Sequence, residues 1–227
     1  MAKYMIHACT DRMHYVEFYL IPSMVEQGID KSDIILYADS GDGCLQSHVK
    51  SFMQASHLPY DGVWHLQDDV LICSDFKERT EKYDNGLVCG FASYYDSRKN
   101  WKEGEATGKN MWYSFPCMRI PTAIITHYVN WFNTWVWRDN QYKHWVDENK
   151  HDDTIFRIFM ENYYPKYPAL NLAPNLVEHI DWLIGGSIVN AFRKDKIVRS
   201  IYWNDEDRVE ELKERLKNDL YYRQTKC

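Results

Sequence analysis

The sequence lacks the short motifs that mark several common enzyme classes. It contains no G-x-x-x-x-G-K-[ST] phosphate loop, no G-x-G-x-x-G dinucleotide motif, no G-x-S-x-G nucleophile turn and no H-E-x-x-H zinc motif. These absences argue against P-loop nucleotide hydrolases, dinucleotide-dependent oxidoreductases, serine hydrolases of the α/β type and zinc proteases.

Paired cysteines, long apolar runs and a positive charge excess are also missing. The 6 cysteines are irregularly spaced without a C-x-x-C pair, so we expect reduced thiols and a cytoplasmic location. No apolar run approaches a membrane span, and the residues after Met1 do not resemble a signal peptide. The formal charge of −6 argues against a broad nucleic-acid surface. These features predict a soluble protein without a membrane span.

Aromatic residues, by contrast, are abundant. The 227 residues include 9 Trp and 17 Tyr, and many of them lie between about 94 and 150 among polar residues. Most such rings belong to a hydrophobic core, but exposed rings stack on sugars and bases. The excess therefore favours a protein that binds carbohydrate or nucleotide, and the length fits a single domain over 1–227.

The order of apolar segments predicts an α/β fold. Short apolar runs at 4–8, 33–38, 63–66 and 87–92 read as strands, the second of them buried on both faces. Apolar residues at helical spacing follow each of the first two strands, and Gly28 ends the first of these helices. The same spacing recurs at 122–136 and 151–163. This alternation predicts a mostly parallel, Rossmann-like central sheet flanked by helices. Further strands are expected at 169–173 and 196–202, and an amphipathic helix from Asp205 onward that includes Leu220.

Polar residues follow the first three predicted strands. They are Thr10 and Arg12, then Asp39, then Gln67, Asp68 and Asp69. Ligands of parallel sheets bind beyond the carboxyl ends of the strands, so these residues mark a candidate site. Two adjacent, buried carboxylates are unfavourable unless a cation neutralises them. We therefore expect a divalent metal at Asp68–Asp69, with an acidic turn as the alternative.

Two later segments can complete that site. Asp152 and Asp153 begin a predicted helix, where one carboxylate caps the helix and the other can act as a general base. His179 ends an apolar strand; it is either a metal ligand or a core residue. The literal D-x-D at Asp205-Glu206-Asp207 is instead interpreted as a helix start, where carboxylates favour the helix dipole.

In this order the residues resemble the GT-A fold of nucleotide-sugar glycosyltransferases, over most of the chain. The resemblance implies that Asp69 binds Mn²⁺ or Mg²⁺ at the donor diphosphate and that His179 is a further ligand. It implies that Asp68 lies near the ribose or the metal's water molecules, and that Asp153 is the base of an inverting enzyme, paired with Asp152. Thr10, Arg12, Asp39 and Gln67 fall where the family holds the nucleotide. The motif Gln67-Asp68-Asp69 departs from a strict D-x-D.

The resemblance also divides the chain by expected role. Residues 1–92 would bind the nucleotide-sugar, 93–203 would bind the acceptor and carry the base, and 204–227 would form a C-terminal helix. Trp101, Trp112 and Tyr113 would line the acceptor site, and the loop Arg98–Lys109 would close over the donor.

We therefore expect a metal-dependent, inverting glycosyltransferase that uses a UDP-sugar. A glycosyltransferase without a membrane span would come from a bacterial or viral setting or be an excised domain. The acceptor would be a hydroxyl of a polysaccharide, a protein or a hydroxymethylated DNA base. Two other classes remain open. A nucleotidyltransferase would normally carry a glycine-rich basic loop near the first strand, which this sequence lacks. A non-catalytic sugar- or nucleotide-binding module would bind its ligand without metal-dependent turnover.

Overall fold

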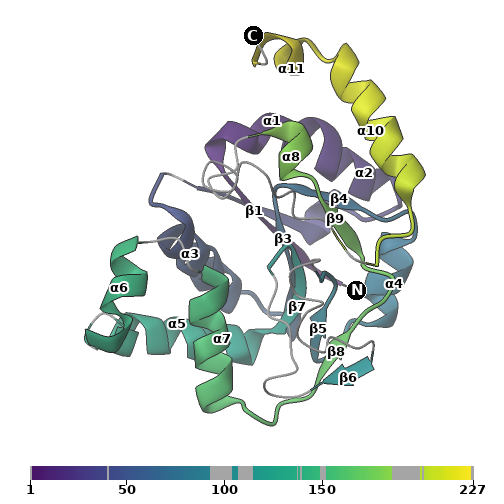
Figure 1. Ribbon diagram of the computed structural model, residues 1–227. Coiled ribbons are helices and arrows are strands. Elements are labelled where there is room, and N and C mark those ends of the chain that lie inside the picture. Colours follow the sequence, from purple (N-terminus) through teal and green to yellow (C-terminus); the bar gives the residue numbers. More distant parts are fainter. Residues whose placement is uncertain are drawn as a thin grey trace.

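A central sheet with helices on both faces organises the molecule, whose computed structural model describes residues 2–39, 41–92, 104–106, 115–136, 138, 140–148, 152–185, 200 and 202–225 (Figure 1). Within these residues the sheet has seven strands in the order β2-β1-β3-β7-β5-β8-β6. Their bounds are β1 (Tyr4–Ala8), β2 (Ile34–Ala38), β3 (Gly62–Gln67), β5 (Leu87–Cys89), β6 (Gly104–Ala106), β7 (Cys117–Pro121) and β8 (Ala169–Asn171).

The pairing of these strands confirms the predicted α/β fold with a mostly parallel sheet. Strand β1 pairs in parallel with both β2 and β3, and β5 pairs in parallel with β8. Strand β7 is antiparallel to β3 and β5, and β6 is antiparallel to β8. Strands β2, β1, β3, β5 and β8 therefore share one direction in a Rossmann-like arrangement. The sequence did not predict β7, which separates the two parallel groups.

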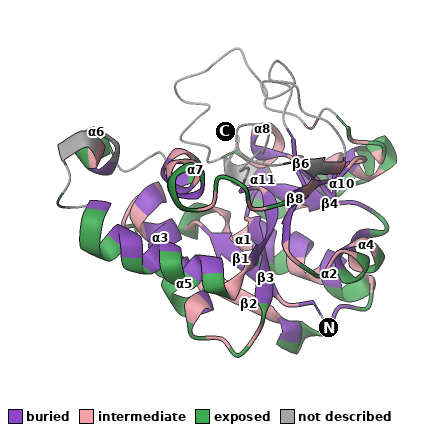
Figure 2. Ribbon diagram, turned by 90° about the horizontal axis from the view of Figure 1, so that it is seen from below, coloured by how far each residue is buried: buried purple, intermediate pink, exposed green. Residues whose placement is uncertain are grey.

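Helices cover the two faces of this sheet as separate layers (Figure 2). On one face lie α3 (Cys44–Ser56), α5 (Thr122–Trp131) and α7 (Asp152–Tyr163); the other carries α2 (Ile21–Glu26) and α4 (Phe76–Lys82). The remaining helical segments are η1 (Thr10–Arg12), α1 (Met13–Tyr15), η2 (Val16–Leu20), η3 (Lys31–Asp33), η6 (Phe132–Val136), α6 (Asn140–Glu148), α8 (Asp181–Ile184), α10 (Glu206–Asn218) and α11 (Leu220–Thr225). None of the helices among the described residues is long and apolar enough to cross a bilayer.

Side chains that alternate between the two faces of the sheet form one hydrophobic core under each helical layer. Successive strand residues point to opposite faces. Tyr4 and Ile6 of β1 accordingly join the core under α2 and α4, whereas Met5 joins the core under α3, α5 and α7. Strand β3 repeats the pattern, with Trp64 in the first core and Val63 in the second.

Most predicted helices and strands are confirmed, with two corrections. The predicted double burial of the second strand is wrong: β2 lies at the sheet edge, and Ile34, Ile35, Leu36 and Tyr37 are only half-buried. An apolar run of that length occurs both in edge strands and in central strands of a sheet, so the sequence alone does not distinguish them. The helix from Asp205 onward does not include Leu220, because Asp219 is extended (ψ 123°) and ends α10. Gly28 stops the first helical run with φ 83°, as predicted.

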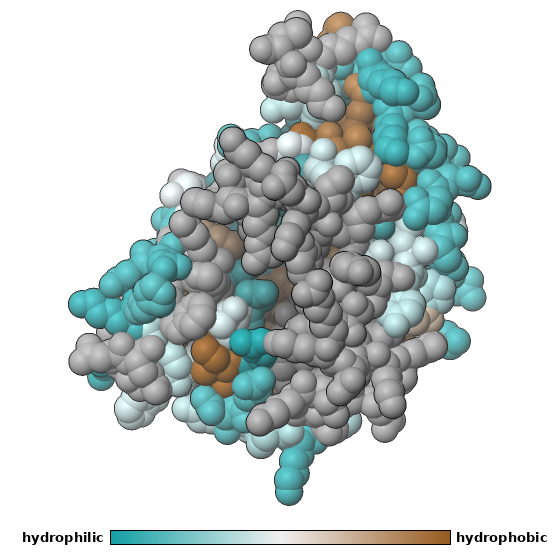
Figure 3. Space-filling model, in the orientation of Figure 1, coloured by the Kyte–Doolittle hydropathy of each residue, from teal (hydrophilic) through white to brown (hydrophobic). Residues whose placement is uncertain are grey.

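The C-terminal helix α10 is amphipathic, as its sequence indicates. Val209, Leu212 and Leu216 are buried against the first core. In Figure 3, hydrophilic atoms cover the outer edge at the upper right of the molecule and hydrophobic atoms lie along the inner side. The predicted strand 196–202 lies outside the described residues except for 200 and 202, and the predicted three-part division of the chain stays a prediction.

A second, smaller sheet positions the candidate site. Strands β4 (Val70–Ile72) and β9 (Val177–His179) pair antiparallel, with Val70 opposite His179. Strand β4 begins directly after Asp68–Asp69, so this pairing brings the distant end of β9 to the end of β3.

Candidate functional site at the carboxyl edge of the sheet

The ends of β1 and β2 meet at one edge, as the parallel sheet predicts. The main-chain N–H of Asp39 donates to the Ala8 carbonyl (2.7 Å), and the Thr10 hydroxyl donates to the Asp39 carbonyl (2.8 Å). The Asp39 carboxylate accepts from the N–H groups of Gly41 (2.8 Å) and Asp42 (3.2 Å). The carboxylate of Asp39 therefore stabilises its own turn, and the exposed Thr10 lies beside it.

Asp68 lies at the same edge, one strand over. It is buried, and its Oδ2 accepts from the main-chain N–H of Cys9 at 2.5 Å. Its Oδ1 lies 3.2 Å from Nη2 of Arg12. Burial raises the pKa of Asp68 to about 7; Arg12 opposes the rise and Asp69 adds to it. Asp68 thus joins the first residues after β1 to the end of β3.

Asp69 is also buried, and cationic groups surround it. Arg12 Nη1 donates to its Oδ2, and Nε2 of His179 lies 3.4 Å from the same oxygen. Burial alone raises the pKa of Asp69, but Arg12 and His179 outweigh burial and hold the pKa below its usual range. Its other oxygen, Oδ1, is buried without a hydrogen-bond partner among the described residues.

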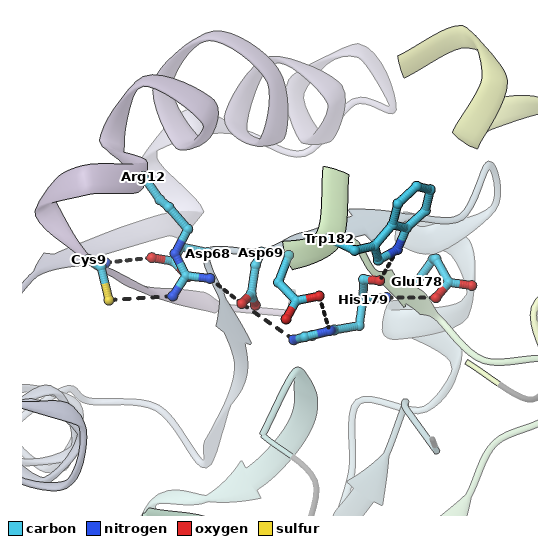
Figure 4. Close-up of polar contacts among 8 residues, drawn as sticks. Cys9, Arg12, Asp68, Asp69, Glu178, His179 and Trp182 are labelled. Carbon is cyan, nitrogen blue, oxygen red and sulfur yellow. Dashed lines mark hydrogen bonds and ion pairs between the residues drawn. The ribbon is translucent and has the colours of Figure 1, made fainter. Parts of the chain in front are cut away.

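His179 completes the group from the opposite side. Figure 4 shows Arg12 and His179 approaching the two aspartates from opposite directions. Nδ1 of His179 lies 3.2 Å from Oδ1 of the buried Asp181, at the start of α8. Burial lowers the pKa of His179, but Asp69 and Asp181 reverse this effect and raise it to about 10. The imidazole is therefore held between two carboxylates.

Neighbouring contacts fix the backbone around His179. Trp182 Nε1 donates to the His179 carbonyl at 3.2 Å, and the fully buried Glu178 accepts from the main-chain N–H of Ser200 at 2.9 Å. The N–H of Ile180 donates to the Asp69 carbonyl at 2.8 Å. Asp69 and His179 are thus tied together through the main chain as well as through their side chains.

The residues around Asp69 fit a divalent cation. Oδ1 of Asp69 is a buried acceptor without a hydrogen-bond partner in the described part of the chain. Nε2 of His179 lies beside the same carboxylate, and because a ligand imidazole is neutral, it would bind an ion only after losing the proton that Asp69 and Asp181 hold on the ring. Asp181 contacts the other ring nitrogen, which is the arrangement that orients metal-binding histidines in proteins. A carboxylate and an imidazole together suit Mn²⁺, and the carboxylates suit Mg²⁺. The sequence singled out Asp69 and His179 but missed Asp181, whose signal is an acidic residue two positions after the histidine.

The acidic pair at the start of α7 divides into an inner and an outer carboxylate. Asp152 is 6% exposed, its Oδ1 accepts from the N–H of Asp153 (2.9 Å), and its Oδ2 lies 3.7 Å from Nδ1 of His48. Burial raises the pKa of Asp152 to about 7, and the charge of Asp153 adds to the rise. Asp153 is exposed, and its Oδ1 accepts from the N–H of Thr154 at 2.6 Å.

The other predicted site residues are placed as follows. Arg12 contacts the two aspartates, and its predicted contact with the nucleotide stays a prediction. Gln67 is half-buried, and its N–H donates to the Pro116 carbonyl (3.3 Å). Of the loop Arg98–Lys109, only 104–106 is described, and Trp101, Trp112 and Tyr113 lie outside the described residues, as does residue 151. Asp205-Glu206-Asp207 starts α10 as predicted, and Asp205 accepts from the N–H of Ser74 (2.7 Å).

Comparison with known proteins adds little to this geometry. No protein-family model and no curated protein sequence matches the chain. Among solved structures, it is similar to one titled "Crystal Structure of A197 from STIV", with a TM-score of 0.42 and 13% sequence identity. The similarity covers 79% of this chain and 86% of that chain. A likeness at this level assigns no function, so the argument for function rests on the site.

Proposed function

We propose that the protein is a metal-dependent, inverting glycosyltransferase of the GT-A type, moving a sugar from a UDP-sugar to an acceptor hydroxyl. The observation that carries the proposal is the pairing of Asp69 with His179 at the carboxyl edge of the sheet, with Nε2 of His179 3.4 Å from Oδ2 of Asp69. Oδ1 of Asp69, buried without a hydrogen-bond partner among the residues that the structure describes, supports a further cationic ligand at this point. Nucleotides bind α/β sheets at this edge.

In this proposal the chain's residues hold the donor in three ways. Asp69 and His179 hold Mn²⁺ or Mg²⁺, with Asp181 orienting His179. When bound, the ion neutralises negative charge on the departing diphosphate. Arg12 fixes the direction of the two aspartates, and Asp68 anchors them to the main chain at Cys9. Thr10 and Asp39, which follow β1 and β2, and Gln67, the last residue of β3, would face the nucleoside, because these three parallel strands end at the same edge of the sheet.

Asp153 is the general base of the proposed reaction. It is exposed at the start of α7, whereas Asp152 is enclosed beside His48. Only the outer carboxylate is accessible to an acceptor. The acceptor oxygen attacks the anomeric carbon as its proton passes to Asp153. The new bond from carbon to the acceptor oxygen forms while the bond to the diphosphate breaks, and the nucleoside diphosphate leaves with that bonding electron pair.

A panel of donor sugars tests the proposal directly. The protein would be incubated with UDP- and GDP-sugars, Mn²⁺ and candidate acceptors of three kinds: a polysaccharide, a protein and hydroxymethylated DNA. We expect release of UDP that depends on Mn²⁺ and rises with one acceptor. Binding of UDP-sugar without release under any condition would support a binding module instead. Consumption of a nucleoside triphosphate with a sugar phosphate would support a nucleotidyltransferase.

A further inference from the structure

Three histidines lie side by side in the interior, beneath the candidate site. His7 comes from β1, His65 from β3 and His48 from α3, and strand alternation turns His7 and His65 toward α3. One nitrogen from each ring falls within 4.8 Å of the other two. His48 and His65 are fully buried, and His7 is 7% exposed. None of the three belongs to the Asp69–His179 group.

Each ring turns one nitrogen toward a protein group outside the cluster. Nδ1 of His65 lies 3.2 Å from the Phe115 carbonyl, so this nitrogen carries the hydrogen and donates it. Nε2 of His7 lies 2.7 Å from the Ser47 hydroxyl. Nδ1 of His48 faces the Asp152 carboxylate at 3.7 Å. Metal-binding histidines in proteins use their second nitrogen as His65 does, by donating to a carbonyl or a carboxylate. The distance from His48 to Asp152 is that of an ion pair and is too long for a hydrogen bond.

The nitrogens on the opposite side of two rings have no protein partner. Nε2 of His65 and both ring nitrogens of His48 are buried and form no hydrogen bond within the described part of the chain. Buried polar atoms are normally paired, so each such atom calls for an explanation. Burial lowers the pKa of His7 to about 4 and that of His65 to about 3, and it holds the pKa of His48 well below its usual value. At neutral pH the rings are therefore neutral and carry lone pairs.

We propose that His7, His48 and His65 form a second metal site, which binds a Zn²⁺-like transition ion and joins β1, β3 and α3. Three imidazoles leave a fourth position of a tetrahedral ion open, the arrangement of three-histidine zinc sites. Imidazole ligands favour Zn²⁺, Co²⁺, Ni²⁺ and Cu²⁺ over Mg²⁺. This site therefore prefers different metal ions from the Asp69–His179 group, where carboxylate ligands dominate. Asp152 orients His48 without binding the ion.

The alternative is that the three rings are ordinary core residues. His48 packs on Phe115 with ring centroids 4.0 Å apart and on Phe52 at 4.2 Å, as an aromatic core residue would. In that case the rings would not respond to metal, and replacing His48 with an apolar residue would be harmless. Packing on aromatic rings does not, however, account for buried ring nitrogens of His48 and His65 that have no hydrogen-bond partner among the described residues, in a group whose ring nitrogens lie within 4.8 Å of one another.

Ring-nitrogen NMR on the intact wild-type protein tests the proposal without any substitution. The probe is Zn²⁺ alone, added to metal-free protein at neutral pH. We expect shifts of the ring nitrogens of His7, His48 and His65 and a rise in melting temperature by mass action, whether or not His179 also responds. Absence of shifts in all three histidines, or shifts confined to His179, would overturn the proposal.

Substitutions then separate this site from the Asp69–His179 group. Co²⁺ replaces Zn²⁺ as a coloured probe, and its visible bands should vanish in His48→Gln and His65→Gln but persist in Asp69→Asn. Asp152→Asn should weaken Zn²⁺ binding by roughly 10–100-fold, the usual effect of removing a group that orients a ligand, and Asp153→Asn should not. Cobalt bands that survive His48→Gln in a folded protein would contradict the assignment. If both histidine variants fail to fold, the wild-type NMR result decides alone.

Discussion

Nε2 of His179 lies 3.4 Å from Oδ2 of Asp69 because Val70 and His179 are opposite each other in the β4–β9 pair. Asp69 and His179 are 110 positions apart in the chain (179 − 69). The hydrogen bond from the N–H of Ile180 to the Asp69 carbonyl extends the pairing by one step and fixes the aspartate's backbone. A two-stranded sheet outside the central one thus builds the centre of the candidate site.

The first prediction concerns Arg12. Arg12→Met removes the guanidinium that contacts both Asp68 and Asp69 and leaves two buried carboxylates with less positive charge. Breaking a buried ion pair from one side typically costs about 3–5 kcal/mol of unfolding free energy. Chemical denaturation of the metal-free protein would measure this loss. Adding Asp68→Asn to Arg12→Met should recover part of the stability, and so should Mn²⁺. An Arg12→Met protein as stable as the wild type would contradict this description of the pair.

The second prediction concerns Asp181. Asp181→Asn keeps the side chain's shape but removes the charge beside Nδ1 of His179. We expect Mn²⁺ affinity to fall by roughly 10–100-fold, because groups that orient a ligand have effects of this size. Titration calorimetry would measure the affinity. Asp207→Asn is the matched control: it lies in the literal D-x-D at the start of α10 and should leave Mn²⁺ affinity unchanged. Equal losses in the two variants would count against the site.

Asp153 and Asp152 provide the third prediction. Asp153→Asn should lower acceptor-dependent transfer by roughly 10²–10⁴-fold, the usual contribution of a general base, with donor and Mn²⁺ binding close to wild type. Asp152→Asn should leave transfer largely intact, because its carboxylate is enclosed beside His48 and is not accessible to an acceptor. If Asp152→Asn abolishes transfer and Asp153→Asn does not, the roles are reversed. If neither slows transfer, comparing the anomers of donor and product by NMR would show whether the enzyme inverts.

The fourth prediction is a pH dependence at the C-terminal helices. Oδ2 of Asp219 accepts from Nε2 of His14 (2.8 Å) and from the Tyr19 hydroxyl (2.6 Å). Burial raises the pKa of Asp219, but the bonds from His14 and Tyr19 outweigh it and lower the pKa from 3.8 to about 2. A depressed carboxyl pKa stabilises the fold above the unfolded value, and this stability is lost as the pH falls from about 4 to about 2.

Asp219→Asn should remove that contribution. At pH 7 we expect a loss of about 1–2 kcal/mol, as for hydrogen bonds to a charged, partly exposed group. Denaturation curves recorded between pH 7 and pH 2 would give the free energy of unfolding at each pH. The values for the variant and the wild type should converge as the pH approaches 2. Glu17→Gln, an exposed change on the same helical run as His14, is the control and should show no convergence. A stability difference that stays constant with pH would contradict the role of the carboxylate's charge.

The sequence predicted the parallel strands and the residues at their ends, because apolar runs and the turns after them are local features. Strand β1 and the segments 44–56 and 122–136 show this most clearly. The sequence did not predict β7, which inserts between β3 and β5 through long-range pairing, nor the short pair β4–β9. For the same reason, the sequence did not predict that Arg12 and Asp181 contact the other residues of the site. The three clustered histidines were not recognised either, since 7, 48 and 65 share no local spacing.

The most direct test of the central claim is the thermal shift of the wild type and of Asp69→Asn with UDP and Mn²⁺. If Asp69 and His179 hold an ion that in turn holds the diphosphate, UDP and Mn²⁺ together should raise the wild-type melting temperature by more than the sum of their separate effects, because each ligand strengthens binding of the other. Asp69→Asn should fold and lose this joint shift. A joint shift of the same size in Asp69→Asn, or strictly additive shifts in the wild type, would contradict the claim.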